Sequence, residues 1–240
     1  MQEKTPGIIL HSIKHNDSTS IVSIYTQRFG RMAYMVYGLG KKKSLCRPAL
    51  LQPLTLVDLD VAHSPHKDIQ RIKDIRVGIQ LTNISSDPVK NALALFLSEV
   101  LFRTLKQTDS DEDLFLFIES ATLYLNESDA SLANFHLVFL LKLTRFLGFE
   151  PNHDSSYCAY FDLLEGVFVL DKPRHEYFLD SNYSVDLHKL LSVDFTSMNQ
   201  IVFSREKRAG MLNAIIEFYK LHIPDFHGVH SLDVLHSLFD

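Results

Sequence analysis

The first 76 residues of the chain alternate short apolar runs with clusters of turn-forming residues. Most of the runs are rich in β-branched side chains, and glycine, proline, asparagine or aspartate lies between them, which is the pattern of short strands joined by turns. The expected strands are residues 8–13, 20–25, 31–37, 51–61 and 69–76. Five short strands with no helical period among them predict a small closed barrel, and the five-stranded OB-fold is the arrangement that suits them best.

A helical period replaces this alternation from residue 86 onward. Asp87 and Pro88 have the composition of a helix start, and apolar residues then recur at every fourth position from Val89 to Leu105. Further helices are expected at residues 114–125, 132–147, 184–191, 205–222 and 228–239.

The domain organisation follows from this change of period. The sequence predicts an α+β protein, with an OB-fold β-barrel in residues 1–79 and an all-α helical domain in residues 80–240. Residues 150–182 are rich in aromatic and turn-forming residues, show no clear period, and are expected to be an irregular segment of the second domain. A chain of 240 residues, of which 46% are hydrophobic and 22% charged, is long and apolar enough to fold both parts.

The net charge of −5 conceals a division between the two parts of the chain. Residues 1–76 hold 12 lysines and arginines against 6 aspartates and glutamates, whereas the remaining residues hold 12 against 23. A basic first module and an acidic second one indicate different partners, and a basic module is typical of a unit that binds a polyanion. The alternative is that the division only tunes solubility.

Basic residues of the first module gather at its turns and strand ends, where they can neutralise phosphates with little dependence on sequence. Aromatic residues lie among them, and aromatic rings on a barrel face can stack on bases. The period of two places Arg31 and Tyr37 on one face of their strand and Tyr34 on the other, so some of these rings belong to the core. The alternative for residues 41–43 is a solvated loop. The predicted nucleic-acid-binding residues are Lys14, Arg28, Arg31, Tyr37, Lys41, Lys42, Lys43, Arg47, Arg71, Lys73 and Arg76.

Catalytic and metal-binding patterns are weak in this sequence. The residues around Lys41 lack the glycine and the hydroxyl residue that a P-loop needs at fixed spacing, and no hydrolase, zinc-protease or dinucleotide-binding motif occurs. The two cysteines, Cys46 and Cys158, cannot form a four-cysteine zinc site. The closely spaced pairs His63/His66 and His227/His230 have no cysteine or carboxylate nearby at the spacing that would complete a set of four ligands. Asp58 and Asp60 share a strand face and leave one alternative open, a metal-dependent nuclease. We expect no catalytic residue, metal or cofactor.

The N-terminus shows no apolar segment of the kind found in signal peptides. The most apolar stretch, residues 132–149, is interrupted by Lys142 and Arg145 and is too short to span a bilayer. Scarce cysteines fit a reducing compartment, so a cytoplasmic protein is expected.

Several short motifs occur in a fixed order along the first module. They are Gly7-Ile-Ile-Leu10, Tyr25-Thr26 with Phe29-Gly30-Arg31, Val36-Tyr-Gly38, Lys43-Ser44, Leu50-Leu-Gln-Pro53 and Arg76. In this order and spacing, residues 6–80 resemble the RecO family of DNA repair and recombination mediators. The resemblance continues more loosely through the helical part, in Leu147-Gly148-Phe149-x-Pro151 and a closing Ser231-x-x-Val234-Leu235.

The resemblance implies an OB-fold followed by a helical domain, in a protein that is not an enzyme. Such a mediator binds single- and double-stranded DNA, anneals strands, and helps to load a recombinase onto DNA coated with single-stranded-DNA-binding protein. RecR and the acidic C-terminal tail of the coating protein are the partners that the resemblance implies. The second hypothesis is a general single-strand or RNA-binding OB protein whose helical part only oligomerises it.

One departure from the family concerns zinc. Many members carry two Cys-x-x-Cys pairs after the Leu-Gly-Phe motif, whereas this stretch holds only Cys158. Zinc is therefore expected to be absent, with hydrophobic packing in its place.

The few positive residues of the helical domain are predicted to bind an acidic partner, because the negative net charge of that domain argues against DNA binding there. Internal ion pairs with its abundant carboxylates are the alternative. The predicted partner-binding residues are Lys142, Arg145, Arg205, Lys207 and Arg208.

Overall fold

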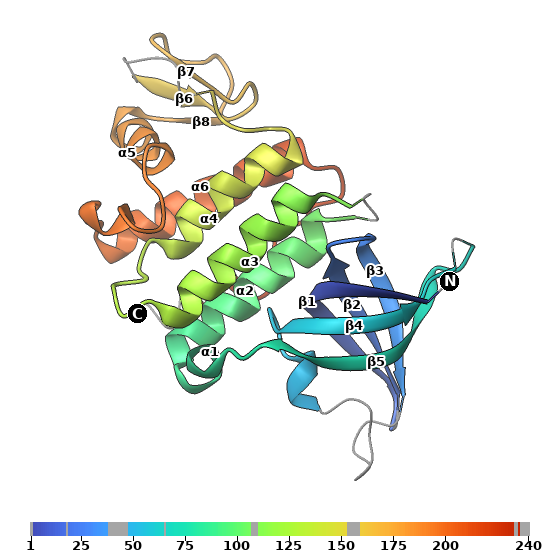
Figure 1. Cartoon of the computed structure of the whole chain (residues 1–240). Coiled ribbons are helices and arrows are strands. Elements are labelled where there is room, and N and C mark those ends of the chain that lie inside the picture. The colour runs from blue at the N-terminus through green and yellow to red at the C-terminus, as the bar shows by residue number, and fades with distance from the viewer. Residues whose placement is uncertain are drawn as a thin grey trace. The chain divides into compact units, whose positions relative to one another are not determined.

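The computed structural model describes residues 2–17, 19–37, 48–64, 66–106, 110–152, 159–232 and 235. The chain divides into two compact units, Met1–Glu127 and Ser128–Asp240, which Figure 1 shows in colours that run from blue to red along the sequence. Within the described residues, the first unit contains a β-barrel and three α-helices, and the second contains three α-helices and a small sheet.

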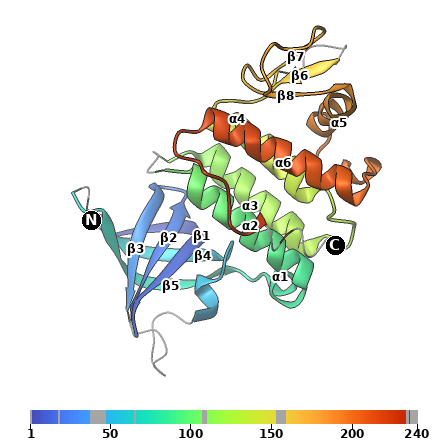
Figure 2. The same ribbon diagram turned by 180° about the vertical axis from the view of Figure 1, so that it is seen from behind.

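Five strands of the first unit form a closed barrel (Figure 2). Their order is β1-β2-β3-β5-β4, and all neighbours are antiparallel except β3 and β5, which run parallel. The strands are β1 (Gln2–Asn16), β2 (Thr19–Thr26), β3 (Gly30–Tyr37), β4 (Leu56–Ala62) and β5 (Ile69–Ile79). The predicted five-stranded OB-fold barrel is therefore confirmed.

Alternate side chains of the strands fill the barrel, because successive residues of a strand point to opposite faces. Burying each large apolar side chain contributes roughly 1.5–3 kcal/mol. The core cluster consists of Ile9, Val22, Ile24, Tyr34, Val36, Val57, Leu59, Val61, Ile72 and Ile75.

The strand expected at residues 51–61 begins later than predicted. A short 3-10 helix, η1 (Pro48–Leu51), and a turn come first, so β4 starts at Leu56. Leu54 has a left-handed backbone (φ 56°), and its N–H donates to the carbonyl of Ile9 at 2.8 Å. Pro53 has no N–H to give to a strand ladder, which accounts for the turn at this point.

Three helices complete the first unit. They are α1 (Thr82–Ser86), α2 (Pro88–Thr104) and α3 (Glu112–Glu127). Asp87 caps α2 as predicted, because its carboxylate accepts the N–H groups of Val89 at 2.8 Å and Lys90 at 3.1 Å. Asp111 performs the same task for α3, where its carboxylate accepts the N–H of Leu114 at 3.0 Å.

A buried polar contact joins these helices. The amine of Lys90 is buried and donates to the carbonyl of Asn126 in the last turn of α3 at 2.9 Å. The side-chain oxygen of Asn126 in turn accepts the N–H of Asn83 in the first turn of α1 at 3.0 Å. The domain boundary predicted after residue 79 marks the change from strands to helices, and the compact unit continues past it to Glu127.

The second unit is built on two helices that run in the same direction. Asn134 before α4 bonds to Arg208 near the start of α6, and Phe149 after α4 stacks on His222 at the end of α6. Gly148 adopts φ 81° and ends α4 as predicted. The elements of this unit are α4 (Phe135–Leu147), α5 (Ser181–Leu191), the 3-10 helix η2 (Met198–Gln200) and α6 (Arg205–His222).

Two further observations concern predicted helices. The helix expected at residues 228–239 falls partly outside the described residues. Among the helices that the structure describes, none combines the length and apolar character required to cross a membrane.

Three short strands occupy the segment that was expected to be irregular. They are β6 (Tyr160–Asp162), β7 (Val167–Val169) and β8 (Phe178–Leu179), in the order β7-β6-β8. Strands of two or three residues are too short to show an alternating pattern, so the sequence does not reveal them. The buried carboxylate of Asp162 supports this sheet, because it accepts the N–H of Leu164 at 2.9 Å and lies 3.0 Å from Nε2 of His175.

Candidate nucleic-acid interface

Tyr37, Arg71 and Lys73 come together at the place where β3 and β5 part. The pairing of these two strands ends with Met35 opposite Arg71, and a groove of about 440 Å³ opens beyond it. The floor consists of core side chains of the barrel, whereas the ring of Tyr37 is 53% exposed and both cations are exposed. The lining residues are Val36, Tyr37, Ala62, Arg71, Ile72, Lys73 and Ile75.

The charge of this groove is available to a ligand. The amine of Lys73 donates to Oε1 of Gln2 at 2.6 Å, and Nε2 of Gln2 donates to Oδ2 of Asp60 at 2.6 Å, so a neutral amide separates the cation from this carboxylate. Tyr37 is also the last described residue before residues 38–47, so the chain enters its most basic stretch from the rim of the groove. The predicted contacts in that stretch, Lys41, Lys42, Lys43 and Arg47, lie outside the described residues.

Three other predicted cations, each with a side chain more than half exposed, take part in ion pairs elsewhere on the barrel. Ion pairs with an exposed cation contribute little stability, about 0–1 kcal/mol, so a phosphate can compete for the cation. The pairs join Lys14 to Asp17 at 2.7 Å, Arg28 to Glu3 at 2.8 Å, and Arg76 to Asp74 at 2.7 Å.

Arg31 is bound inside the first unit. Its Nη1 donates to the carbonyls of Phe102 and Leu105 at the end of α2, both at 2.6 Å, and its Nε donates to Oγ of Ser23 at 3.0 Å. The guanidinium also lies over the ring of Phe102, 4.3 Å from the centroid, and the ring of His11 lies against that of Phe102 in a tilted arrangement, with 4.5 Å between the centroids. Burial lowers the pKa of both Arg31 and His11. These contacts fasten α2 to the barrel, and a contact of Arg31 with DNA stays a prediction.

Of the four aromatic residues near the predicted basic contacts, Tyr25, Phe29, Tyr34 and Tyr37, only Tyr37 is exposed. Tyr34 is buried in the barrel core, which confirms that it faces away from Tyr37. Tyr25 is also buried, and its hydroxyl donates to the carbonyl of Asp111 at 3.4 Å. Burial raises the pKa of Tyr25 and of Tyr34 to about 12. Phe29 is partly buried against the core.

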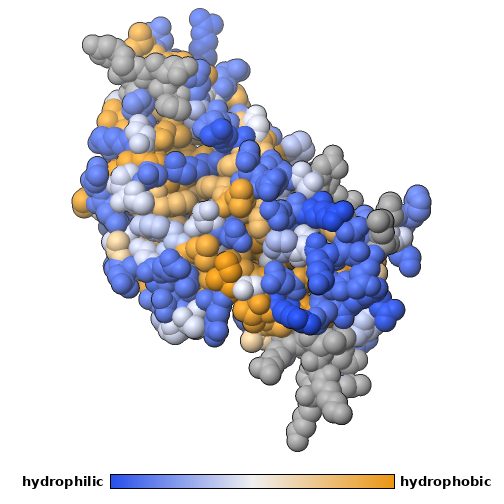
Figure 3. Space-filling model, viewed as in Figure 1, coloured by the Kyte–Doolittle hydropathy of each residue, from blue (hydrophilic) through white to orange (hydrophobic). Residues whose placement is uncertain are grey.

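The outward face of β4 is acidic. Asp58 and Asp60 both point outward from it, and Asp74 of β5 lies directly opposite Asp60. Figure 3 shows hydrophilic side chains over this side of the barrel. Within the described ranges, no group of three histidine, cysteine or carboxylate side chains is placed to hold a metal ion. The nuclease alternative therefore gains no support from the arrangement of Asp58 and Asp60.

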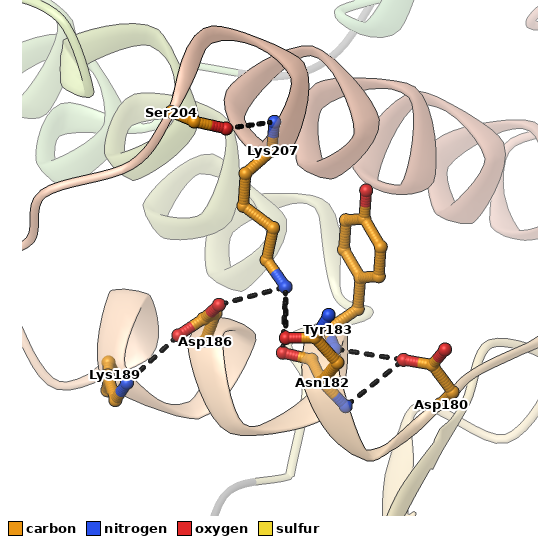
Figure 4. A network of polar contacts seen from close by, with 7 residues as sticks. All are labelled: Asp180, Asn182, Tyr183, Asp186, Lys189, Ser204 and Lys207. Carbon is orange, nitrogen blue, oxygen red and sulfur yellow. Dashed lines mark hydrogen bonds and ion pairs between the residues drawn. The ribbon is translucent and has the colours of Figure 1, made fainter.

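In the second unit, a polar network holds Lys207 near the start of α6 (Figure 4). Its amine donates to the carbonyl and Oδ1 of Asn182 at 2.9 and 2.8 Å, and pairs with Asp186 at 3.0 Å. The amine also lies 4.0 Å from the ring centroid of Tyr183. Gly210, one turn further along α6, leaves the space that the Tyr183 side chain occupies. Lys207 therefore joins α6 to α5.

The other predicted partner-binding residues do not form one cluster. Arg208 is half-buried and donates to Oδ1 of Asn134 at 3.3 Å and to the carbonyl of Phe203 at 3.2 Å. Arg145 is exposed in the last turn of α4. At a rise of about 1.5 Å per residue, it lies about 16 Å along the helix from Asn134, so one small acidic group cannot meet Arg145 and Arg208 together. The remaining two are Lys142, half-buried on α4, and Arg205, exposed on α6.

Comparison with protein families matches residues 1–78 to Recombination protein O N terminal and residues 85–231 to Recombination protein O C terminal. The chain belongs to the RecO family. The DNA repair protein RecO of Bacteroides fragilis is 38% identical over 242 residues, and the match covers 100% of both chains. The RecO proteins of Azobacteroides pseudotrichonymphae and Flavobacterium johnsoniae are 37% and 32% identical, again with 100% of both chains covered. RecO membership places this chain among the proteins of DNA repair and recombination.

The structure explains one RecO motif, the Thr-x-x-x-Gly-Arg stretch between β2 and β3. The hydroxyl of Thr26 accepts the N–H of Phe29 at 3.1 Å and donates to the carbonyl of Gly30 at 3.0 Å. Gly30 has φ 61°, a left-handed conformation that favours glycine. Arg31 then reaches the end of α2, so in this RecO protein the motif builds a turn and fastens a helix.

The stretch after the Leu147-Gly148-Phe149 motif, where many RecO proteins carry two Cys-x-x-Cys pairs, leads to a prediction about metal content. Cys158 and His153 lie outside the described residues, and His175 is bonded to Asp162. We expect purified protein to contain no stoichiometric zinc and to keep its circular dichroism spectrum in chelator, because metal-dependent folds lose structure when the metal is removed. Elemental analysis that finds one zinc per chain would contradict this and would implicate His153 and His175.

Sequence reasoning missed a set of apolar residues near the groove of this RecO protein. They lie on the outward face of β1, β2, β3 and β5, one on each strand. The sequence held one indication of them. The strand at residues 20–25 is apolar on both faces, so one of its apolar faces must lie on the outside of the barrel. The missed residues are Ile13, Ile21, Met35 and Ile69.

Proposed function

We propose that the chain is a DNA-binding mediator of recombination and repair that binds and anneals single strands, binds duplex DNA, and assists the loading of a recombinase onto coated DNA. It acts through binding, without a catalytic step. The observation that carries this proposal is the groove between β3 and β5, where an exposed aromatic ring and two exposed cations surround an apolar floor. Membership of the RecO family supports it.

The groove suits nucleic acid for electrostatic and geometric reasons. Arg71 and Lys73 are able to neutralise phosphates, and the ring of Tyr37 offers a surface on which a base can stack. The basic residues 41–47, which follow β3, would extend the contact along the backbone. If about five phosphates are neutralised, the logarithm of the affinity for single strands falls against the logarithm of salt with a slope of roughly −3.5.

The test measures the affinity of the full chain for a labelled oligothymidylate across a salt series. A slope near the expected value supports phosphate binding, and an affinity that does not change with salt contradicts it. An annealing assay with complementary strands coated by single-stranded-DNA-binding protein then separates a mediator from a general single-strand or RNA-binding protein. Mg²⁺-dependent cleavage of the DNA would instead support the nuclease alternative.

The partners proposed for the chain are a RecR-like protein and the acidic tail of the single-stranded-DNA-binding protein. For the tail, we propose the exposed cations of the second unit, with Arg145 as the main contact. Arg145 is exposed, and its guanidinium can hold a carboxylate in a fork of two hydrogen bonds. Lys207 and Arg208 are engaged within the unit and contribute mainly to its structure.

Arg145→Glu is expected to lower the affinity for a labelled acidic tail peptide about tenfold, because it replaces an attraction by a repulsion. The affinity for bare DNA should not change. Lys220→Glu is the matched control, since Lys220 is an exposed cation of α6 that pairs with Glu217 at 3.0 Å. Peptide anisotropy that is unchanged in Arg145→Glu, or equally reduced in both variants, would place the tail site elsewhere.

A further inference from the structure

Apolar side chains form a row across the outward face of the barrel. Ile13 of β1 lies opposite Ile21 of β2, Ile21 opposite Met35 of β3, and Met35 opposite Arg71 of β5. Residues that lie opposite each other in a sheet point to the same side, so these four side chains are neighbours. With strands about 4.8 Å apart, the row is about 14 Å long.

The row is open to solvent at Ile13, half-buried at Ile21 and Met35, and widened by exposed neighbours. Ile13 is 55% exposed, and Tyr37, two residues after Met35 on the same face, is 53% exposed. Ile69 is 39% exposed and lies opposite Ala33, in the adjacent row of the same face. Single exposed apolar residues are ordinary on protein surfaces, but a contiguous set in direct register is typical of a binding surface.

The surroundings of the row indicate which ligand suits it. On one side, α2 ends against the barrel where the ring of His11 lies against that of Phe102, so the next row of the face is partly covered there. The row itself ends at Arg71, and Lys73 follows on the same strand. An apolar strip with cations at its end matches a ligand that combines flat apolar groups with a negatively charged backbone.

We propose that this row selects single-stranded over double-stranded DNA, an inference that rests on the proposed function. In a single strand the faces of the bases are free, and their burial against apolar and aromatic side chains is favourable whatever the base. In a duplex the bases are stacked inside, and the surface presents phosphates and groove edges. The row therefore gains contacts only with the single strand, while Arg71 and Lys73 attract phosphates of both forms.

The test replaces the row by threonines in Ile13→Thr/Ile21→Thr/Met35→Thr, which keeps side chains suited to strands. The control is Val77→Thr/Ile79→Thr, because these residues are 51% and 41% exposed at the far end of β5. Anisotropy is measured with an oligothymidylate and with a duplex of equal length. We expect the row variant to lose about tenfold in affinity for the single strand, to stay within about twofold for the duplex, and to keep the salt slope, while the control keeps both affinities.

The outcomes are distinguishable. An equal loss for both DNA forms, or no loss for the single strand, overturns the selection by the row while leaving DNA binding intact. A wild-type chain that binds neither form contradicts the proposed function and this inference together. If circular dichroism shows that the triple variant does not fold, Met35→Thr alone is measured in its place, with an expected loss of about threefold for the single strand only.

Discussion

Replacing Arg31 by methionine is expected to lower the free energy of unfolding by about 3 kcal/mol, because hydrogen bonds of a charged group contribute about 1.5–3 kcal/mol and a cation–π contact adds about 0.5–1 kcal/mol. The substitution removes the donors that hold the carbonyls of Phe102 and Leu105, both at 2.6 Å, and leaves the end of α2 unfastened. Urea denaturation followed by circular dichroism measures the loss.

A neighbouring arginine offers the matched control. Arg28 lies on the same turn, its side chain is 57% exposed, and it pairs with Glu3 at 2.8 Å. Arg28→Met is expected to cost about 0.5 kcal/mol, as is usual for an exposed ion pair. If Arg28→Met and Arg31→Met destabilise the protein equally, the contacts of Arg31 with α2 do not stabilise the unit.

Replacing Lys41, Lys42, Lys43 and Arg47 by alanine is expected to weaken the binding of every single-stranded sequence by about one to two orders of magnitude at low salt. Each phosphate contact that is lost reduces the salt slope by about 0.7, so the slope should become shallower by about 2.8 if each residue contacts one phosphate. Contacts with phosphates carry no information about the bases, so the loss should be the same for different sequences. Anisotropy titrations over a salt series measure both quantities.

The control for this variant must change the net charge equally. Replacing Lys172, Arg174, Lys189 and Lys220 by alanine removes four cations from the second unit and leaves the barrel untouched. Both variants should keep the free energy of unfolding within about 1 kcal/mol. An equal loss of DNA affinity in both would show that net charge acts at a distance, and an unchanged affinity in the barrel variant would show that residues 41–47 are only solvated.

Sequence reasoning succeeded where the signal was local. The carboxylate of Asp87 and the left-handed Gly148 mark helix ends through contacts within a few residues, and both could be predicted. The short apolar runs in residues 20–25 and 31–37, bounded by turn-forming residues, likewise located β2 and β3. The sheet of β6, β7 and β8 was missed, because its strands are shorter than the period that would reveal them.

The roles of individual cations depend on distant partners and could not be predicted in the same way. Arg31 bonds to carbonyls more than 70 residues later in the chain, and Lys207 bonds to Asn182, which lies 25 residues earlier. A basic residue looks the same in the sequence whether it meets a phosphate or a carbonyl of its own chain. For Ile13 and Met35, the strand register was needed to show that they form one surface.

For the DNA binding proposed above, Asp58, Asp60 and Asp74 on the outward side of β4 and β5 would also affect the rate at which DNA reaches the protein. A DNA strand that approaches these aspartates is repelled, whereas one that approaches Arg71 and Lys73 is attracted. The electrostatic field would therefore orient the barrel relative to the DNA before the two make contact. Such orientation raises the fraction of collisions in which the binding groove faces the DNA, and so raises the association rate constant. Because added salt shortens the range of this field to about 10 Å at 0.1 M, productive encounters become rarer as ionic strength rises.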